Sequence, residues 1–273
     1  TFNHCPKELH GNMNGLSLHY YVYPDGLEMK GSSTDFDDKT WYRTLNKALF
    51  MKTLIERHGH CMDEFDPEKK VGMIVDEWGS WYTVEPGTNP GFLYQQNTMR
   101  DALIAGITLN VFNKHSDRVK MANLAQVVNV LQSVILTDGA DMILTPTYHI
   151  FDMYKYHQDA MLADSYVETE SVGVEEEWQV PNLTESVSVA EDGAIHITLT
   201  NLSLVKDYEV RTVITDFHVN KVKGEIVHGE MHDMNTFEKP DEVVIKEFNK
   251  VEKTAEGFTF TIPKCSVLHL EVR

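Results

Sequence analysis

The sequence predicts an α/β segment followed by an all-β segment, and two observations carry that prediction. Across residues 1–158, short apolar runs typical of buried strands alternate with longer runs of helical periodicity. After residue 159 apolar and polar side chains alternate in short runs, which are separated by turn residues such as Asp192-Gly193. A period of two indicates antiparallel strands in a β-sandwich. We therefore expect one domain at 1–158 and a β-sandwich at 159–273.

Composition excludes some classes of partner. The chain has 273 residues, 42% of them hydrophobic, which is typical of a folded protein. A formal net charge of -18 argues against binding nucleic acid or an anionic membrane surface, whereas a neutral sugar is compatible with it. The three cysteines, Cys5, Cys61 and Cys265, are widely separated and suggest no disulfide framework. Together with the absence of an evident signal peptide, they favour a cytoplasmic location.

The α/β segment begins with a strand and a long helix. The run at 16–22 is apolar and aromatic, and Pro24-Asp25-Gly26 turns the chain after it. The next helix is expected to begin at Asp37 or Asp38, whose carboxylates can cap free amides, and to stop at Gly59. His58, His60 and Cys61 could be read as metal ligands. Since no second Cys/His pair accompanies them, we interpret them as a polar helix end and expect neither a metal nor a cofactor.

The most informative stretch is residues 71–79, V-G-M-I-V-D-E-W-G. It begins as a β-branched run of the kind found in strands buried on both faces, and then breaks into two carboxylates. Carboxylates at the end of a buried strand are paired, hydrogen-bonded or used, and in a β/α barrel the chemistry lies at these ends. Glu77 is therefore the first candidate for a working residue. The alternative is a helix cap or a partner of an arginine.

The remaining elements follow in order. The turn-rich loop at 80–91 carries Trp81, which is either a core residue or a platform for a sugar ring. A buried helix is expected at 93–113, a third strand at 127–132 ending in Gln132, and a last helix from Pro146 to residue 156 or 158. Three strands that each finish in a polar or aromatic group indicate the rim of one pocket.

Several motifs, in order, resemble the C-terminal half of glycoside hydrolase family 51, the α-L-arabinofuranosidases. They are L-S-L-H-Y-Y, I-V-D-E-W-G-S-W-Y, Y-Q-Q-N-T-M-R-D-A-L, M-A-N-L-A-Q-V-V-N-V-L-Q and L-T-P-T-Y-H-I-F. The resemblance runs from about Gly15 to Arg273. It implies that residues 1–158 form the C-terminal part of a (β/α)8 TIM barrel, followed by a jelly-roll-like β-sandwich at 159–273.

The resemblance also implies roles for individual residues. Glu77 matches the nucleophile of a retaining glycosidase, Tyr21 the tyrosine that contacts it, and Gln132 an amide that binds sugar hydroxyls. His19 matches a histidine at the pocket rim, and Trp81 is a further substrate-binding candidate. The implied activity is release of terminal α-L-arabinofuranosyl residues from arabinose-containing carbohydrates.

One part of the family pattern is missing. The family's acid/base glutamate lies in a G-N-E motif, whereas Gly11-Asn12-Met13 has no carboxylate and is interpreted as a loop. Asp76 is expected to point to the other side of its strand, which makes it a poor substitute. We therefore expect an N-terminal half of the same enzyme, in the same or a separate chain, to supply the acid/base. The resemblance further implies a homo-oligomer such as a hexamer.

Two alternatives stay open at this point. The first is a related retaining xylosidase or endoglucanase with the same kind of strand-end glutamate. The second is a non-catalytic carbohydrate-binding or assembly subunit that kept the fold.

Overall fold

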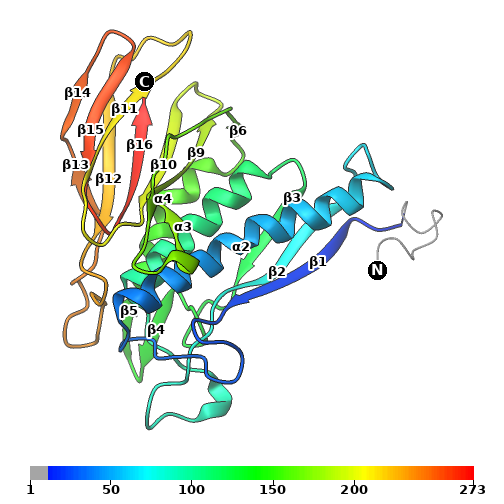
Figure 1. Cartoon of the computed structure of the whole chain (residues 1–273), viewed down its shortest axis with the longest axis vertical. Helices are drawn as coiled ribbons and strands as arrows, with labels where there is room; N and C mark the ends of the chain where they lie inside the picture. The colour runs from blue at the N-terminus through cyan, green and yellow to red at the C-terminus, as the bar shows by residue number, and fades with distance from the viewer. Residues whose placement is uncertain (1–11) are drawn as a thin grey trace.

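A computed structural model describes residues 12–273 (Figure 1). Cys5, Gly11 and the other residues of the expected N-terminal loop up to position 11 lie outside the described part.

The first half of the chain contains a three-stranded parallel sheet with helices between its strands. Its elements are β1 (Gly15–Val22), α2 (Asp38–Asp63), β2 (Gly72–Ser80), α3 (Met99–Lys114) and β3 (Val119–Leu124). The strand order is β1-β2-β3, so β2 is central and the outer edges of β1 and β3 are unpaired within the described residues. The sheet is therefore open, and a closed barrel is not formed by residues 12–273.

The ends of both helices follow from local contacts. Asp37 caps α2 through a bond from Thr40 N to its Oδ1 (2.9 Å), as predicted. The helix does not stop at Gly59 but continues to Asp63, because Gly59 is buried inside the helix rather than adopting a left-handed terminal conformation. The predicted start of α3 at residue 93 was also wrong. Thr98 and Asp101 form a capping box that begins the helix at Met99.

The third strand lies earlier in the sequence than predicted. It is β3, residues 119–124, and the run at 127–132 is irregular. Asn129 and Leu131 have φ values of 58° and 54°, which are left-handed and incompatible with an extended strand. Only the end of the run is buried, at Leu131 and Gln132, whereas Val127 and Val128 are exposed.

A hairpin and a short helix complete this half. Strands β4 (Ile135–Asp138) and β5 (Asp141–Leu144) pair antiparallel, and Gly139, with φ of +58°, lies in the turn between them. The last helix is α4 (Pro146–Tyr154), followed by the 3-10 turn η3 (Lys155–His157), in agreement with the prediction.

The second half is an antiparallel β-sandwich, as predicted. One sheet has the order β13-β12-β16-β10-β9-β6 and the other β11-β15-β14. The bounds of the elements are β6 (Met161–Leu162), β7 (Ser171–Val172), η4 (Glu176–Trp178), β8 (Val180–Pro181), β9 (Leu183–Val189), β10 (Ile195–Asn201), β11 (Tyr208–Val213), β12 (Val222–His228), β13 (Lys246–Phe248), β14 (Val251–Lys253), β15 (Gly257–Ile262) and β16 (Ser266–Val272).

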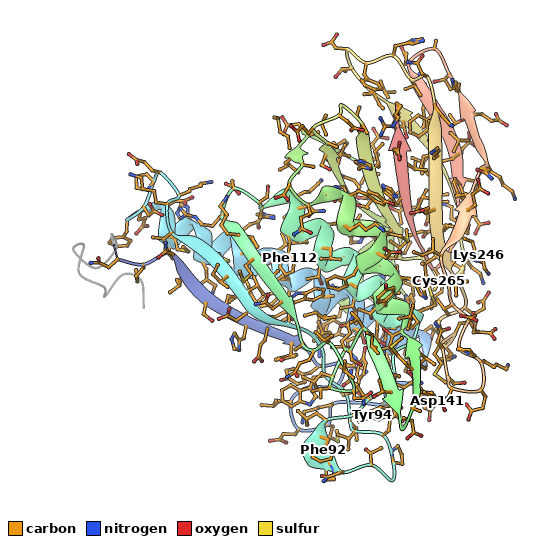
Figure 2. The ribbon with its side chains drawn as sticks, turned by 180° about the vertical axis from the view of Figure 1, so that it is seen from behind. Phe92, Tyr94, Phe112, Asp141, Lys246 and Cys265 are labelled. Carbon is orange, nitrogen blue, oxygen red and sulfur yellow. The ribbon has the colours of Figure 1, made fainter. Side chains whose placement is uncertain are left out.

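Helix α3 joins the two halves. It lies between the parallel sheet and the six-stranded sheet (Figure 1). Phe112, labelled in Figure 2, is a residue of this helix. Phe112 meets the Trp78 ring edge-on at a centroid distance of 5.4 Å. On the opposite side Gly106 allows close approach, because a Cβ there would lie 2.7 Å from Thr200 Cγ2. One hydrophobic cluster accordingly includes residues of both halves, so the sheet that carries Glu77 is joined to the sandwich through α3.

Candidate functional site

The site is built where β1 and β2 approach their C-terminal ends side by side. The two strands are parallel and pair His19 with Glu77 and Tyr21 with Gly79. Since alternate residues of a strand share a face, His19 and Tyr21 project to the same side of the sheet. The Tyr21 hydroxyl donates a hydrogen bond to Glu77 Oε2 at 2.7 Å. The structure therefore brings His19, Tyr21 and Glu77 together.

Asp76 does not point away from this group, contrary to the expectation from strand alternation. Register shifts interrupt the pairing at Leu18/His19 and again on β2 between Val75 and Trp78. The ring of His19 consequently lies near both carboxylates, with Nδ1 3.6 Å from Glu77 Oε2 and Nε2 4.0 Å from Asp76 Oδ2. A bulge of this kind re-aims side chains that strict alternation would separate.

The Glu77 carboxylate is accessible and is not consumed by an architectural contact. Its side chain is 45% exposed, and within residues 12–273 no lysine or arginine lies within 4.0 Å of it. It also caps no helix, since it lies inside β2 and the next α-helix begins only at Met99. Both structural alternatives for a strand-end carboxylate are thereby excluded for the described chain.

Tyr21 acts as a permanent hydrogen-bond donor to this carboxylate. Burial raises the pKa of the Tyr21 phenol, and the hydrogen bond to Glu77 and the negative charge of Glu77 raise that pKa further. The phenol therefore stays protonated over the pH range in which proteins are folded. The protonated phenol donates to one oxygen of the Glu77 carboxylate and fixes it, which leaves the other free.

An aromatic wall borders the group. The Trp81 ring meets Tyr21 edge-on at a centroid distance of 5.1 Å, and Tyr23 lies 5.8 Å from Trp81. The Lys30 ammonium lies 5.6 Å from the centre of the Trp81 ring. Sequence reasoning missed Tyr23 and Lys30. Tyr23 follows Tyr21 by two residues, and that spacing was a usable signal for a shared face, whereas nothing in the sequence indicated Lys30.

Gln132 is not part of the exposed group. It is fully buried, and its Oε1 accepts a hydrogen bond from Ser80 N (2.8 Å). Its Nε2 donates to the backbone oxygen of Asp101 (2.9 Å) and to Thr147 Oγ1 (3.2 Å). In this arrangement the amide supports the end of β2 and is not free for a sugar hydroxyl.

A buried polar network fixes the end of β2. Asp101 is fully buried, and its Oδ1 accepts from the Ser80 hydroxyl (2.6 Å) and the Tyr82 hydroxyl (3.0 Å). Its Oδ2 accepts from Thr98 N (2.8 Å). Burial raises the pKa of Asp101, while the charge of Arg100 and these hydrogen bonds oppose the rise. The network ties the strand that carries Glu77 to the first turn of α3.

The described part of the chain shows neither a metal-binding cluster nor a membrane-spanning helix. No group of three His, Cys, Asp or Glu side chains in residues 12–273 is arranged to hold a metal ion, and His58, His60 and Cys61 lie in the last turns of α2. The helices in this range are all too short or too polar to cross a bilayer.

A cavity in the sandwich does not coincide with this group. It has a volume of about 910 Å³ and opens between the sheets of the sandwich, lined by residues of β9, β10 and β11. A smaller groove of about 370 Å³ borders Tyr21 and is lined by Tyr20, Tyr23, Asn46, Lys47 and Trp178. We place the candidate site at Glu77 because an accessible carboxylate, a fixed donor and an aromatic wall converge there.

The chain is similar to known proteins over nearly its full length. Residues 76–266 match the family described as "Alpha-L-arabinofuranosidase C-terminal domain". An intracellular exo-alpha-L-arabinofuranosidase of Bacteroides ovatus is 42% identical over 262 residues, which are 96% of this chain and 51% of that protein. An exo-alpha-(1->6)-L-arabinofuranosidase of Bifidobacterium longum is 25% identical over 288 residues, covering 96% of this chain and 53% of that protein.

A solved structure is similar over the same region. The crystal structure of the GH51 arabinofuranosidase from Xanthomonas axonopodis pv. citri superposes with a TM-score of 0.95 at 41% identity, covering 98% of this chain and 54% of that one. The chain thus spans about half the length of the relatives it matches. It belongs to the α-L-arabinofuranosidases of glycoside hydrolase family 51, whose C-terminal half it matches.

Proposed function

We propose that this chain supplies the nucleophile half of a retaining exo-α-L-arabinofuranosidase. The observation that carries the proposal is the 2.7 Å hydrogen bond from the Tyr21 hydroxyl to the accessible Glu77 carboxylate. A carboxylate that is ionised, oriented and open to solvent on one side has the properties of a glycosidase nucleophile.

In the proposed reaction Glu77 forms a covalent intermediate. One of its oxygens attacks the anomeric carbon of a terminal arabinofuranosyl residue, and the bond from that carbon to the leaving oxygen breaks. A second carboxylic acid donates its proton to the leaving oxygen. The resulting carboxylate then takes a proton from water as the water oxygen attacks the anomeric carbon. Arabinose is released with retained configuration, and Glu77 returns as a carboxylate.

The second carboxyl group has to come from another part of the enzyme. The two groups of a retaining pair flank the scissile bond about 5–5.5 Å apart. Asp76 and Glu77 are consecutive on β2 and share the ring of His19, so they form one wall of the site rather than two. We propose that an N-terminal half contributes this acid/base residue and pairs with the open edges of β1 and β3 to complete a (β/α)8 barrel.

Further features of the proposal concern the surroundings of the site. Tyr21, His19 and Trp81 bind the sugar, whereas Gln132 acts indirectly by holding the end of β2. The barrel portion ends at residue 158 and the sandwich domain spans 159–273. We further propose an intracellular location, as the name of the Bacteroides relative suggests, and a homo-oligomer such as a hexamer.

Covalent labelling tests the nucleophile directly. The complete enzyme that contains this chain is incubated with an activated arabinofuranoside whose intermediate hydrolyses slowly, then digested and examined by mass spectrometry. The label is expected on the peptide that contains Glu77. Glu77→Gln should abolish labelling and lower kcat by about 10⁴-fold or more, while Glu209→Gln on the exposed face of β11 should change neither.

The outcomes separate the alternatives. Labelling of a different carboxylate refutes the assignment of Glu77. A Glu77→Gln protein that loses nothing measurable and still binds arabino-oligosaccharides indicates a binding or assembly subunit. Faster release from aryl xylosides than from aryl arabinofuranosides indicates a related xylosidase or endoglucanase.

A further inference from the structure

Arg100 is a buried cation that lacks the usual carboxylate partner. Its side chain is fully buried at the second position of α3, where its charge acts on the neighbouring Asp101 without a direct ion pair. Within residues 12–273, its Nε and Nη1 have no hydrogen-bond partner. The guanidinium is instead held between two rings, with its central carbon 3.7 Å from the centre of Phe36 and 4.2 Å from that of Tyr82. Even with Asp101 nearby, a buried cation without a direct ion pair costs free energy, so its contacts should have a specific role.

Those contacts join two loops that border the site. The first loop, residues 23–37 between β1 and α2, offers the backbone oxygens of Ser32 and Ser33 to Arg100 Nη2, at 2.8 and 3.2 Å. The second loop, residues 81–98 between β2 and α3, contributes the Tyr82 ring. Arg100 therefore contacts both loops from the helix that follows the second one.

The first loop in turn reaches the wall beside Glu77. Two bonds link the loops directly: Thr83 N donates to Gly31 O at 2.9 Å, and the Ser33 hydroxyl donates to the Glu85 carboxylate. This holds Lys30, the residue before Gly31, above the Trp81 ring. Trp81 packs edge-on against Tyr21, whose hydroxyl holds Glu77. A continuous set of contacts thus runs from Arg100 through the first loop to the wall of the site.

We propose that Arg100 is a positioning residue that holds Lys30 over the Trp81 ring, and thereby holds Trp81 in its sugar-binding orientation. The proposal rests on the proposed function for its kinetic consequence. Arg100 touches no part of the site itself, since Phe36, Tyr82 and the Ser32 and Ser33 carbonyls surround it. It acts by restricting the first loop, so its loss should weaken substrate binding and leave the chemistry at Glu77 nearly intact.

The test compares Arg100→Met with Arg100→Lys in the complete enzyme. Methionine retains apolar contact with both rings but donates no hydrogen bond, and lysine retains the charge without the planar fork. We expect Arg100→Met to raise KM for an aryl arabinofuranoside by about tenfold and to change kcat by less than about threefold. Arg100→Lys should give an intermediate KM. Arg211→Met, which removes an exposed arginine of the sandwich, is the matched control and should leave KM unchanged.

A second readout does not depend on hydrolysis. With 5-fluorotryptophan incorporated, the Trp81 signal, assigned by Trp81→Phe, should move in Arg100→Met and in Lys30→Ala but not in Arg211→Met. If the Trp81 signal moves in Arg100→Met but the protein is inactive, the positioning role of Arg100 is supported and only the enzyme assignment is refuted. An unchanged Trp81 signal in Arg100→Met, or a fall in kcat at constant KM, overturns the positioning role. If Arg100→Met fails to fold, an unmoved Trp81 signal in Arg100→Lys overturns the positioning role equally.

Discussion

Replacing Tyr21 with phenylalanine isolates the interaction that defines the proposed site. The substitution removes one hydroxyl and leaves the ring, whose edge-on contact with Trp81 at 5.1 Å does not involve that oxygen. The lost bond is a donor–carboxylate pair at 2.7 Å. Hydrogen bonds to a charged group contribute about 1.5–3 kcal/mol, roughly a factor of 10 to 150 in an equilibrium or rate constant.

Most of that loss should appear in the attack step. Without the phenol, the Glu77 carboxylate can rotate away from the orientation in which one oxygen faces the anomeric carbon, and misplacement of a reacting group by about 1 Å costs on the order of 100-fold. We expect kcat for an aryl arabinofuranoside to fall by about 10- to 100-fold. The assay is steady-state release of the aryl alcohol by the complete enzyme.

Tyr20 provides the matched control. Its hydroxyl donates a hydrogen bond of the same length, 2.7 Å, to Lys47 O on the opposite face of β1, toward α2. Tyr20→Phe should lower the free energy of unfolding by about 1 kcal/mol and change kcat by less than about threefold. A Tyr21→Phe enzyme with more than half of the wild-type rate, or equal losses in the two variants, would refute the reasoning.

Three further outcomes follow from the structure. Arg118 is 4% exposed and donates to Asp66 Oδ2 at 2.8 Å, so Arg118→Met should lower the free energy of unfolding, measured by thermal melts, by about 3–5 kcal/mol. Arg211→Met, at an exposed ion pair with Glu256, should lower it by less than about 1 kcal/mol, and equal losses would contradict the role of burial. Burial lowers the pKa of His269 to about 3, with a smaller contribution from the neighbouring His196, so below pH 6.5 the unfolded chain binds a proton that the folded chain does not. Unfolding free energy should therefore fall by about 1.6 kcal/mol between pH 6.5 and 5 through this residue, and an unchanged pH slope in His269→Asn, measured by urea titration, would disprove it. Thr98→Ala removes one side of the capping box of α3 and should destabilise the protein by about 1 kcal/mol in urea, whereas an unaltered midpoint would show that Asp101 suffices.

Local sequence patterns were sufficient to predict much of the fold. The change from helical to alternating periodicity near residue 159 predicted the sandwich, and the Asp37 cap, the strand at β2 and the accessible Glu77 were all found from runs of fewer than ten residues. The reason is that a strand's period of two and a helix's first free amides depend only on neighbouring residues.

Non-local packing decided the remaining features. Gln132 looked like a strand end because its run is apolar, but left-handed residues at 129 and 131 turn the chain inward and bury the amide against Ser80. Asp76 joins Glu77 beside His19 only because the pairing of β1 and β2 is irregular, and Arg100 finds its rings on two loops that are distant in sequence. Bulges, left-handed turns and buried cations are stabilised by contacts between distant segments, and a pattern of neighbouring residues carries no information about those contacts.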